Sequence, residues 1–122
     1  FKESKFIEQI VVIGENERFP AALIVPSFSF LKDWCKLKKL NYTSDQEMVA
    51  NPVIVARIQK EVDKYNLGFG NWEQIKKFEL LPKEFSIDAG EMTPKLSLKR
   101  KVILQKYEAL ILKIYDYKNT SL

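Results

Sequence analysis

Two short runs of apolar, mostly β-branched residues near the start of the chain constrain its fold more than any other feature. The first run is residues 10–13 (IVVI) and the second is residues 21–25 (AALIV). Between them lies Gly14, followed by charged and polar residues that are typical of a turn. We therefore predict a β-hairpin over residues 7–26. Because an isolated hairpin is only marginally stable in water, other elements must pack on it.

Residues 27–40 are predicted to form a helix. Apolar side chains recur there at three- and four-residue steps, and Ser27 is the predicted N-cap. The single cysteine of the chain, Cys35, lies in this segment, which excludes an internal disulfide and a multi-cysteine zinc site. With no histidine in the chain to activate it, we interpret Cys35 as a small core residue and not as a nucleophile.

Two further helices are predicted before residue 67. Ser44, with a glutamate three residues later, has the pattern of a capping box and starts a short helix. Asn51 and Pro52 fit the N-cap and the first position of the next helix. The predicted apolar face of that helix consists of Val55, Ile58, Val62 and Tyr65.

Residues 75–80 alternate between apolar and charged side chains, which predicts a third strand. Two glycines precede it, at positions 68 and 70, and we interpret them as a helix C-cap and a turn because the other parts of a phosphate-binding loop are missing. Trp72 is predicted to pack over the sheet edge. The helices that separate this strand from the hairpin leave its direction open. The predicted fold class is α+β, with a small antiparallel three-stranded sheet, made of the hairpin 7–26 and the strand near 75–80, packed with helices.

Cations are concentrated where the loop of residues 83–94 enters a last predicted helix, residues 98–117. Positive charge at a helix N-terminus is mildly unfavourable, and an anionic ligand such as a phosphate would offset that cost. A solvated basic face is the alternative interpretation. The cations are Lys95, Lys99, Arg100 and Lys101.

The same loop carries three acidic residues, Glu84, Asp88 and Glu91. A carboxylate pair for acid–base catalysis or a magnesium site needs rigid placement, and the sequence shows none here. We therefore predict that all three are solvated and that this domain provides no metal ligands.

Composition narrows the function classes. The chain has 122 residues, 46% of them hydrophobic, which suits one domain with its own core. A net charge of +4, from 20 basic and 16 acidic residues, does not suggest a dedicated nucleic-acid binder. No apolar run reaches the roughly 18 residues that a membrane span needs. We predict a cytoplasmic location, with peripheral membrane association left open, and a first residue other than Met predicts a piece of a longer polypeptide.

Taken in order, the segments resemble the C-terminal end of AMP-forming long-chain fatty acid–CoA ligases, members of the adenylate-forming superfamily. The hairpin strands (IEQIVVIG and ALIVP) are followed by LPKEF, then by GEMTP, and then by LSLKRK before a helix. The resemblance covers nearly the whole chain. It implies that residues 1–122 are a single C-terminal lid domain, whose partner is a large N-terminal adenylate- and acyl-binding domain of the same polypeptide that is absent from this sequence.

The resemblance also implies an activity. Family members convert ATP, a fatty acid and CoA into acyl-CoA, AMP and diphosphate, through an acyl-adenylate. ATP and CoA are substrates and Mg²⁺ acts in the parent enzyme, whereas this domain alone is expected to bind none of them. The lid swivels: in one orientation it supplies a lysine for adenylation, and in the other it presents a different face for thioester formation. As a fragment of an acid–thiol ligase, the isolated domain is expected to be inactive.

The long-chain branch commonly has the pattern Thr-Pro-Thr-x-Lys-x-Lys-Arg in this loop. Thr93, Pro94, Lys99 and Arg100 match it, but Ser97 stands where the first lysine is expected. The resemblance assigns nucleotide binding to Thr93 and Arg100.

Two lysines are candidates for the catalytic role that the resemblance implies. We favour Lys95, because in an extended loop it would project to the same side as position 97. Lys99 is the other candidate, although we expect it to be locked into the helix start. A third possibility is that thioester formation survives and adenylation is slow.

Two other function classes are also compatible with the sequence. The first is a stand-alone basic module that binds RNA or an acidic protein through residues 95–101. Against it, those cations lack the interleaved aromatic residues on which single-strand binders stack bases. The second is a purely structural or interaction domain.

Overall fold

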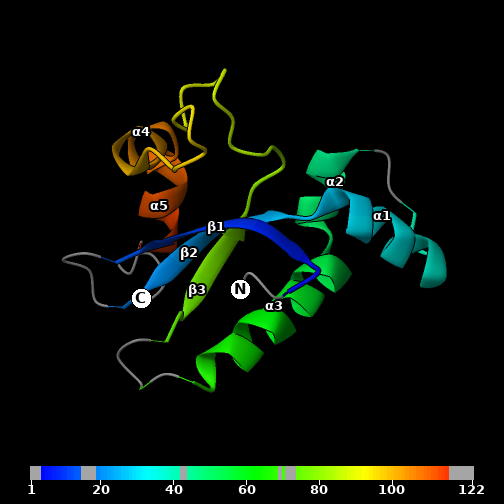
Figure 1. The fold of residues 1–122 in the computed structure, drawn as a ribbon. Helices are drawn as coiled ribbons and strands as arrows, with labels where there is room; N and C mark the ends of the chain where they lie inside the picture. Colours follow the sequence, from blue (N-terminus) through cyan, green and yellow to red (C-terminus); the bar gives the residue numbers. More distant parts are fainter. Residues whose placement is uncertain (1–3, 15–18, 42–43, 69, 71–73, 116–122) are drawn as a thin grey trace. The chain divides into compact units, whose positions relative to one another are not determined.

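The structure is a computed structural model that describes residues 4–14, 19–41, 44–68, 70 and 74–115. It divides into two compact units, Phe1–Glu84 and Phe85–Leu122. In the described part of the first unit lie β1 (Ile7–Ile13), β2 (Ala21–Pro26), α1 (Phe28–Leu37), α2 (Asp45–Ala50), α3 (Pro52–Asn66) and β3 (Lys77–Leu80) (Figure 1). The described part of the second unit contains α4 (Arg100–Lys106) and α5 (Glu108–Ile114).

The predicted hairpin is confirmed, since β1 and β2 pair antiparallel with Ile13 opposite Ala21. β2 is the central strand of the sheet and all of its residues are buried, as its unbroken apolar sequence requires. On its other side β3 runs parallel to it, with Ala21 opposite Lys77 and Ile24 opposite Leu80. The α+β class is therefore confirmed, but the predicted antiparallel direction of the third strand is wrong and the sheet is mixed.

The connection that precedes β3 is long enough to allow its parallel pairing with β2. Parallel neighbours need a crossover of a dozen or more residues, and α1, α2 and α3 all lie between β2 and β3. The 15 residues of α3 span about 22 Å, enough to carry the chain back along the sheet. Asn66, the last residue of α3, holds the chain that enters β3. Its side chain accepts a hydrogen bond from the Ile75 N–H (3.0 Å) and donates one to the Ile75 carbonyl (2.9 Å).

Local signals placed the first three helices correctly. The Ser44 hydroxyl accepts a hydrogen bond from the Glu47 N–H (3.1 Å), and the Asn51 side chain accepts one from the Val53 N–H (2.8 Å). Both predicted caps are therefore confirmed. Ser27 occupies the N-cap position of α1, but its side chain makes no cap hydrogen bond.

The core of the first unit lies between the sheet and these helices. Cys35 is fully buried in it, as predicted, and burial raises the pKa of its thiol, which keeps the thiol protonated. On α3 the buried stripe starts one residue earlier than predicted, at Ile54, because residues at steps of four face the sheet together. Tyr65 is 38% exposed and lies outside the stripe. The core members are Phe6, Ile7, Ala22, Ile24, Leu31, Cys35, Met48, Ile54, Ile58, Val62, Ile75 and Leu80.

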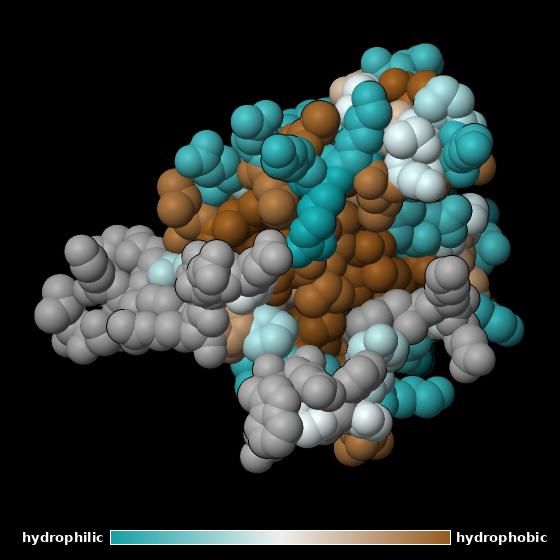
Figure 2. Space-filling view, turned by 60° about the vertical axis from the view of Figure 1, so that its left-hand side comes forward, coloured by the Kyte–Doolittle hydropathy of each residue, from teal (hydrophilic) through white to brown (hydrophobic). Residues whose placement is uncertain are grey.

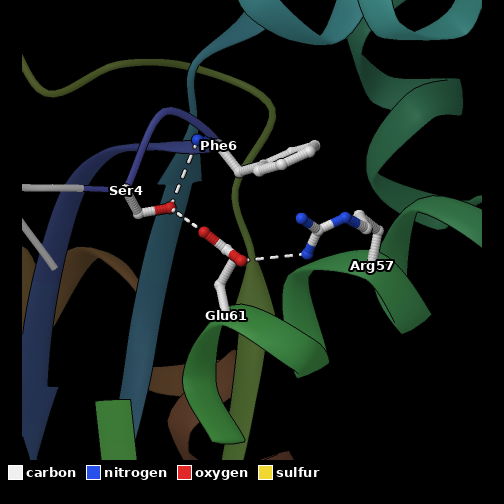
Figure 3. A network of polar contacts seen from close by, with 4 residues as sticks. All are labelled: Ser4, Phe6, Arg57 and Glu61. Atoms are coloured by element: carbon white, nitrogen blue, oxygen red, sulfur yellow. Dashed lines mark hydrogen bonds and ion pairs between the residues drawn. The ribbon is translucent and has the colours of Figure 1, made fainter. Parts of the chain in front are cut away.

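A polar network joins the start of the described chain to α3 (Figure 3). Glu61 lies between two donors: the Ser4 hydroxyl donates to Oε1 at 2.6 Å, and Arg57 Nη1 donates to Oε2 at 2.9 Å. The Phe6 N–H donates to the Ser4 hydroxyl at 3.2 Å, and the Arg57 guanidinium lies 4.1 Å from the centroid of the Phe6 ring. The segment that leads into β1 is therefore anchored to α3.

In the second unit the predicted single helix over residues 98–117 is divided. Tyr107, with φ −104° and ψ 22°, separates α4 from α5. Hydrogen bonds still run from the Tyr107 N–H to the Ile103 carbonyl and from the Ile111 N–H to the Tyr107 carbonyl, so the division is a local distortion rather than a turn. Ile103 and Ile114, the ends of the predicted apolar stripe, are buried.

Some large apolar side chains of the described residues are exposed, among them Leu37, Leu67, Leu96 and Leu112. In the space-filling view, hydrophobic surface lies between hydrophilic side chains (Figure 2). Trp72, which was predicted to pack over the sheet edge, lies outside the described residues. None of the helices in the described part of the chain combines the length and the hydrophobicity of a membrane span.

Candidate functional site

Two of the predicted site residues, Thr93 and Lys95, lie in a tight hairpin of the second unit, in the loop drawn in yellow in Figure 1. At its base, Met92 and Leu98 form an antiparallel bridge. At its tip, the Thr93 N–H donates to the Ser97 carbonyl (2.8 Å), and the Thr93 hydroxyl accepts from the Ser97 N–H (3.2 Å). These bonds give residues 93–97, which we call the tip turn, a defined shape.

Lys95 occupies a central position of a β-turn in this tip. The turn is closed by the Leu96 N–H, which donates to the Thr93 carbonyl at 2.8 Å. Pro94 takes the first central position, where its fixed φ angle is favoured. The extended loop assumed for Lys95 is therefore wrong, because proline and the closing hydrogen bond bend the chain there. Leu96 follows with φ +65°, as in three-residue hairpin loops whose last residue is left-handed.

The candidate cations are accessible. Lys95, Lys99 and Arg100 are all exposed, and among the described residues Lys95 makes no ion pair. Ser97, at the position of the expected lysine, is exposed as well. The tip turn therefore holds one unpaired ammonium group on a bent, hydrogen-bonded backbone, an arrangement that can deliver positive charge to an anionic ligand.

The backbone of Lys99 is fixed at the start of α4, as predicted. Its N–H donates to the Glu91 carbonyl at 2.7 Å, and its own carbonyl accepts from the Ile103 N–H at 3.1 Å. Thr93 uses its hydroxyl within the tip turn and is half-buried. The structure thus brings together Thr93, Lys95 and Ser97 in one turn, and places Lys99 and Arg100 at the helix that follows it.

Glu91 contradicts the prediction that the acids of this loop are solvated. Glu84 and Asp88 are exposed, but Glu91 is only 1% exposed. Its Oε2 accepts a hydrogen bond from Lys106 Nζ at 3.0 Å, and its Oε1 accepts one from the Ser86 N–H at 3.2 Å. These contacts repay part of the desolvation cost that the carboxylate meets on burial.

Sequence reasoning missed Glu91 because its strongest partner lies fifteen residues further along the chain. The available signal was its place between Gly90, a turn residue with φ +78°, and apolar Met92. A charged residue at that boundary faces either direction, so only the packing of α4 decides its burial.

The Glu91 contacts alter the ionisation of two neighbours. The hydrogen bond to Glu91 is the main reason why the pKa of Lys106 is raised; burial acts against it, and the Coulomb attraction to Glu91 adds a smaller upward contribution. The pKa of the Tyr107 phenol is raised first by burial and then by the negative charge of Glu91. Both groups therefore keep their protons in the folded unit to a higher pH than in the unfolded chain. Among the described residues no cluster of three or more metal-ligating side chains occurs.

The left-handed backbone at Leu96 leads to a stability prediction. A side chain with a Cβ atom is strained at φ +65°, whereas glycine is not, and the Leu96 side chain is 66% exposed. We expect Leu96→Gly to raise the free energy of unfolding of the second unit by about 1 kcal/mol. Urea unfolding of the chain would measure it. Leu96→Ala is the matched control, because it removes the same apolar contacts but keeps the Cβ. An equal gain for both variants would contradict the strain argument.

Residues 1–119 match the family of AMP-binding enzyme C-terminal domains. The chain is similar to the long-chain-fatty-acid–CoA ligase FadD15 of Mycobacterium tuberculosis, with 34% identity over 111 residues that cover 90% of this chain and 18% of the relative. It is also similar to long chain acyl-CoA synthetase 2 of Arabidopsis thaliana, with 30% identity in an alignment of 125 positions, gaps included, that covers 95% of this chain and 18% of that protein.

A solved structure shares the fold. It is the A-PCP didomain of carboxylic acid reductase from Segniliparus rugosus in complex with AMP, which matches with a TM-score of 0.72 and 16% identity over 95% of this chain and 15% of the other. In each of these comparisons the present chain spans less than a fifth of its relative.

Proposed function

Because this chain belongs to the family of AMP-binding enzyme C-terminal domains, we propose that it is the lid of a long-chain fatty acid–CoA ligase. The parent polypeptide joins a fatty acid to CoA with ATP, and releases AMP and diphosphate. Its N-terminal domain supplies the pocket for the adenylate and the acyl chain. The similarity to a fatty-acid–CoA ligase over 90% of the chain supports this substrate class.

Lys95 is the catalytic lysine in this proposal. When a carboxylate attacks the α-phosphate of ATP, two anions approach each other, and an ammonium group between them offsets the repulsion in a site closed to water. The observation that carries this assignment is the tip turn, which presents an exposed Lys95 on a hydrogen-bonded backbone. Lys99 is the weaker candidate, because its backbone is held at the start of α4.

Other roles are assigned around that lysine. Arg100, exposed at the first position of α4, contacts the nucleotide phosphates, and Thr93 maintains the turn that carries Lys95 into the site. Mg²⁺ accompanies ATP in the N-terminal domain. After adenylation the lid rotates, which withdraws the tip turn and lets the CoA thiol reach the acyl-adenylate. The isolated domain has no activity in this scheme, because the adenylate pocket is elsewhere.

The size and activity of the native polypeptide test this proposal. An antibody against this domain should detect a species several times larger than the 14.3 kDa of the present chain. That species, once purified, should release AMP only when fatty acid, ATP and CoA are all present, and the 122-residue chain should release none. A native species near 14 kDa, or a large one without fatty acid-dependent AMP release, would overturn the assignment.

A further inference from the structure

Glu91 stands at the base of the hairpin that carries Lys95. Its carbonyl accepts the Lys99 N–H at 2.7 Å, and its N–H donates to the Ser86 carbonyl at 3.1 Å. The backbone of this one residue therefore connects the loop before the hairpin with the chain that leaves it.

The side chain of Glu91 makes a second set of connections in the same two directions. Oε1 accepts from the Ser86 N–H at 3.2 Å and Oε2 accepts from Lys106 Nζ at 3.0 Å. Ser86 belongs to the incoming loop, and Lys106 is the last residue of α4. Next to these contacts, the rings of Phe85 and Tyr107 meet edge to face with centroids 6.2 Å apart. A carboxylate that is 1% exposed thus ties the hairpin base both to the chain before it and to the helix after it.

The buried ion pair between Glu91 and Lys106 is not an efficient source of folding stability. Desolvation of a carboxylate is costly, and replacing a buried ion pair by apolar residues is often neutral or stabilising. The buried carboxylate instead favours one arrangement of the loop, the hairpin and α4 over others. Only in this arrangement do the acceptor atoms of Glu91 all have hydrogen-bond donors. The tip turn begins two residues after Glu91, so the contacts of Glu91 also restrict where the tip turn lies relative to α4.

On the basis of the proposed function, we propose that Glu91 is a positioning residue for adenylation. It holds the tip turn at a fixed place relative to α4, so that Lys95 enters the adenylation site in one orientation. Glu91 touches neither ATP nor the fatty acid, and it acts through Lys95. It has no part in thioester formation, during which the tip turn is withdrawn.

The decisive variant is Glu91→Gln in the full-length enzyme. The amide can still accept from the Ser86 N–H, but it loses the charge that holds Lys106. Because a misplacement of about 1 Å can cost up to about 100-fold in rate, we expect Glu91→Gln to slow adenylate formation about 10-fold. Thioester formation from preformed acyl-adenylate should stay unchanged. Asp88→Asn, at an exposed acid of the same loop, is the matched control and should leave both half-reactions unchanged.

Coupling to Lys95 separates positioning from a general loss of structure. If Glu91 acts through Lys95, the double variant Glu91→Gln/Lys95→Ala should form adenylate no more slowly than Lys95→Ala alone. Multiplied losses would overturn the proposal, as would an equal slowing of both half-reactions by Glu91→Gln. Thermal unfolding of each variant shows whether it is folded at the assay temperature.

A second variant tests the positioning role of Glu91 if Glu91→Gln does not fold. Lys106 is 41% exposed, so Lys106→Gln removes the partner of Glu91 at a site where substitution is better tolerated. It should slow adenylation selectively in the same way. If Lys95→Ala slows adenylation but folded Glu91 and Lys106 variants do not, the positioning role is wrong and the lid function stands. If Lys95→Ala leaves adenylation unchanged, the assignment of Lys95 fails and the positioning role fails with it, whereas the lid function itself is tested separately by the size and AMP release of the native polypeptide.

Discussion

Lys95→Ala in the full-length enzyme is expected to slow adenylate formation by about 100- to 1,000-fold, the usual effect of removing one preorganised group that stabilises transition-state charge. In the proposed mechanism, the ammonium group offsets the repulsion between the attacking carboxylate and the α-phosphate. Thioester formation from preformed acyl-adenylate should be nearly unchanged, because no second anion approaches a phosphate in that step. Diphosphate release measures the first half-reaction, and acyl-CoA formation from supplied acyl-adenylate measures the second.

Two control substitutions make this result specific. Lys101→Ala removes the same charge from an exposed position in α4 and should leave both rates unchanged. Lys99→Ala tests the other candidate lysine, and a larger loss for it than for Lys95→Ala would transfer the catalytic role to Lys99. Equal losses in both half-reactions for Lys95→Ala, or none, would refute the assignment of Lys95.

Glu61→Ala is expected to destabilise the first unit substantially. The carboxylate is the shared acceptor of Ser4 and Arg57, and its side chain is 15% exposed (Figure 3). Hydrogen bonds to charged groups contribute about 1.5–3 kcal/mol, and partial exposure of Arg57 reduces the loss, so we expect the free energy of unfolding to fall by about 2 kcal/mol in urea unfolding. Asp63→Ala is the matched control on the same helix. Asp63 is exposed and bonded only to Gln59 among the described residues, and its loss should have little effect.

The same carboxylate makes stability depend on pH in a defined direction. Burial raises the pKa of Glu61, but the hydrogen bonds from Ser4 and Arg57 and the charges of Arg57 and Lys64 outweigh that effect, so the net pKa is lowered. A lowered folded-state pKa means that the stabilisation is present above the ordinary glutamate pKa of about 4.3 and is lost as the pH falls through the folded-state value. The stability difference between the wild type and Glu61→Gln should therefore shrink on acidification. A difference that stays constant down to about pH 2 would contradict this origin.

Those parts of the fold that depend on local signals were predictable from the sequence. The hairpin follows from two apolar runs and a turn, and the starts of α2 and α3 follow from the side chains of Ser44 and Asn51. The direction of β3 was not predictable, because it depends on where three helices return the chain. The distortion at Tyr107 also escaped prediction, since an apolar stripe continues through it and the i to i−4 hydrogen bonds persist.

For the candidate site, the segment stays a prediction from the sequence, and its shape could not be predicted. Thr93, Pro94 and Lys95 were identified from the order of residue types, yet the left-handed conformation of Leu96 was not, because a leucine rarely adopts it. Glu91 was misjudged for a different reason. The ordinary expectation for an isolated loop carboxylate is solvation, and only the distant Lys106 makes burial tolerable.

The mixed sheet has a consequence for the order in which the domain folds. β2 meets β1 through a short loop, since Ala21 pairs with Ile13 only eight residues before it, but it meets β3 through Lys77, fifty-six residues after it. Closing the longer connection requires more chain entropy to be lost before any contact forms, and pairings distant in sequence form slowly. We therefore expect the hairpin to form early and β3 to dock after α1–α3 have shortened the path. Substitutions in β3 should accordingly accelerate unfolding more than they slow folding, whereas substitutions in the hairpin should do the reverse.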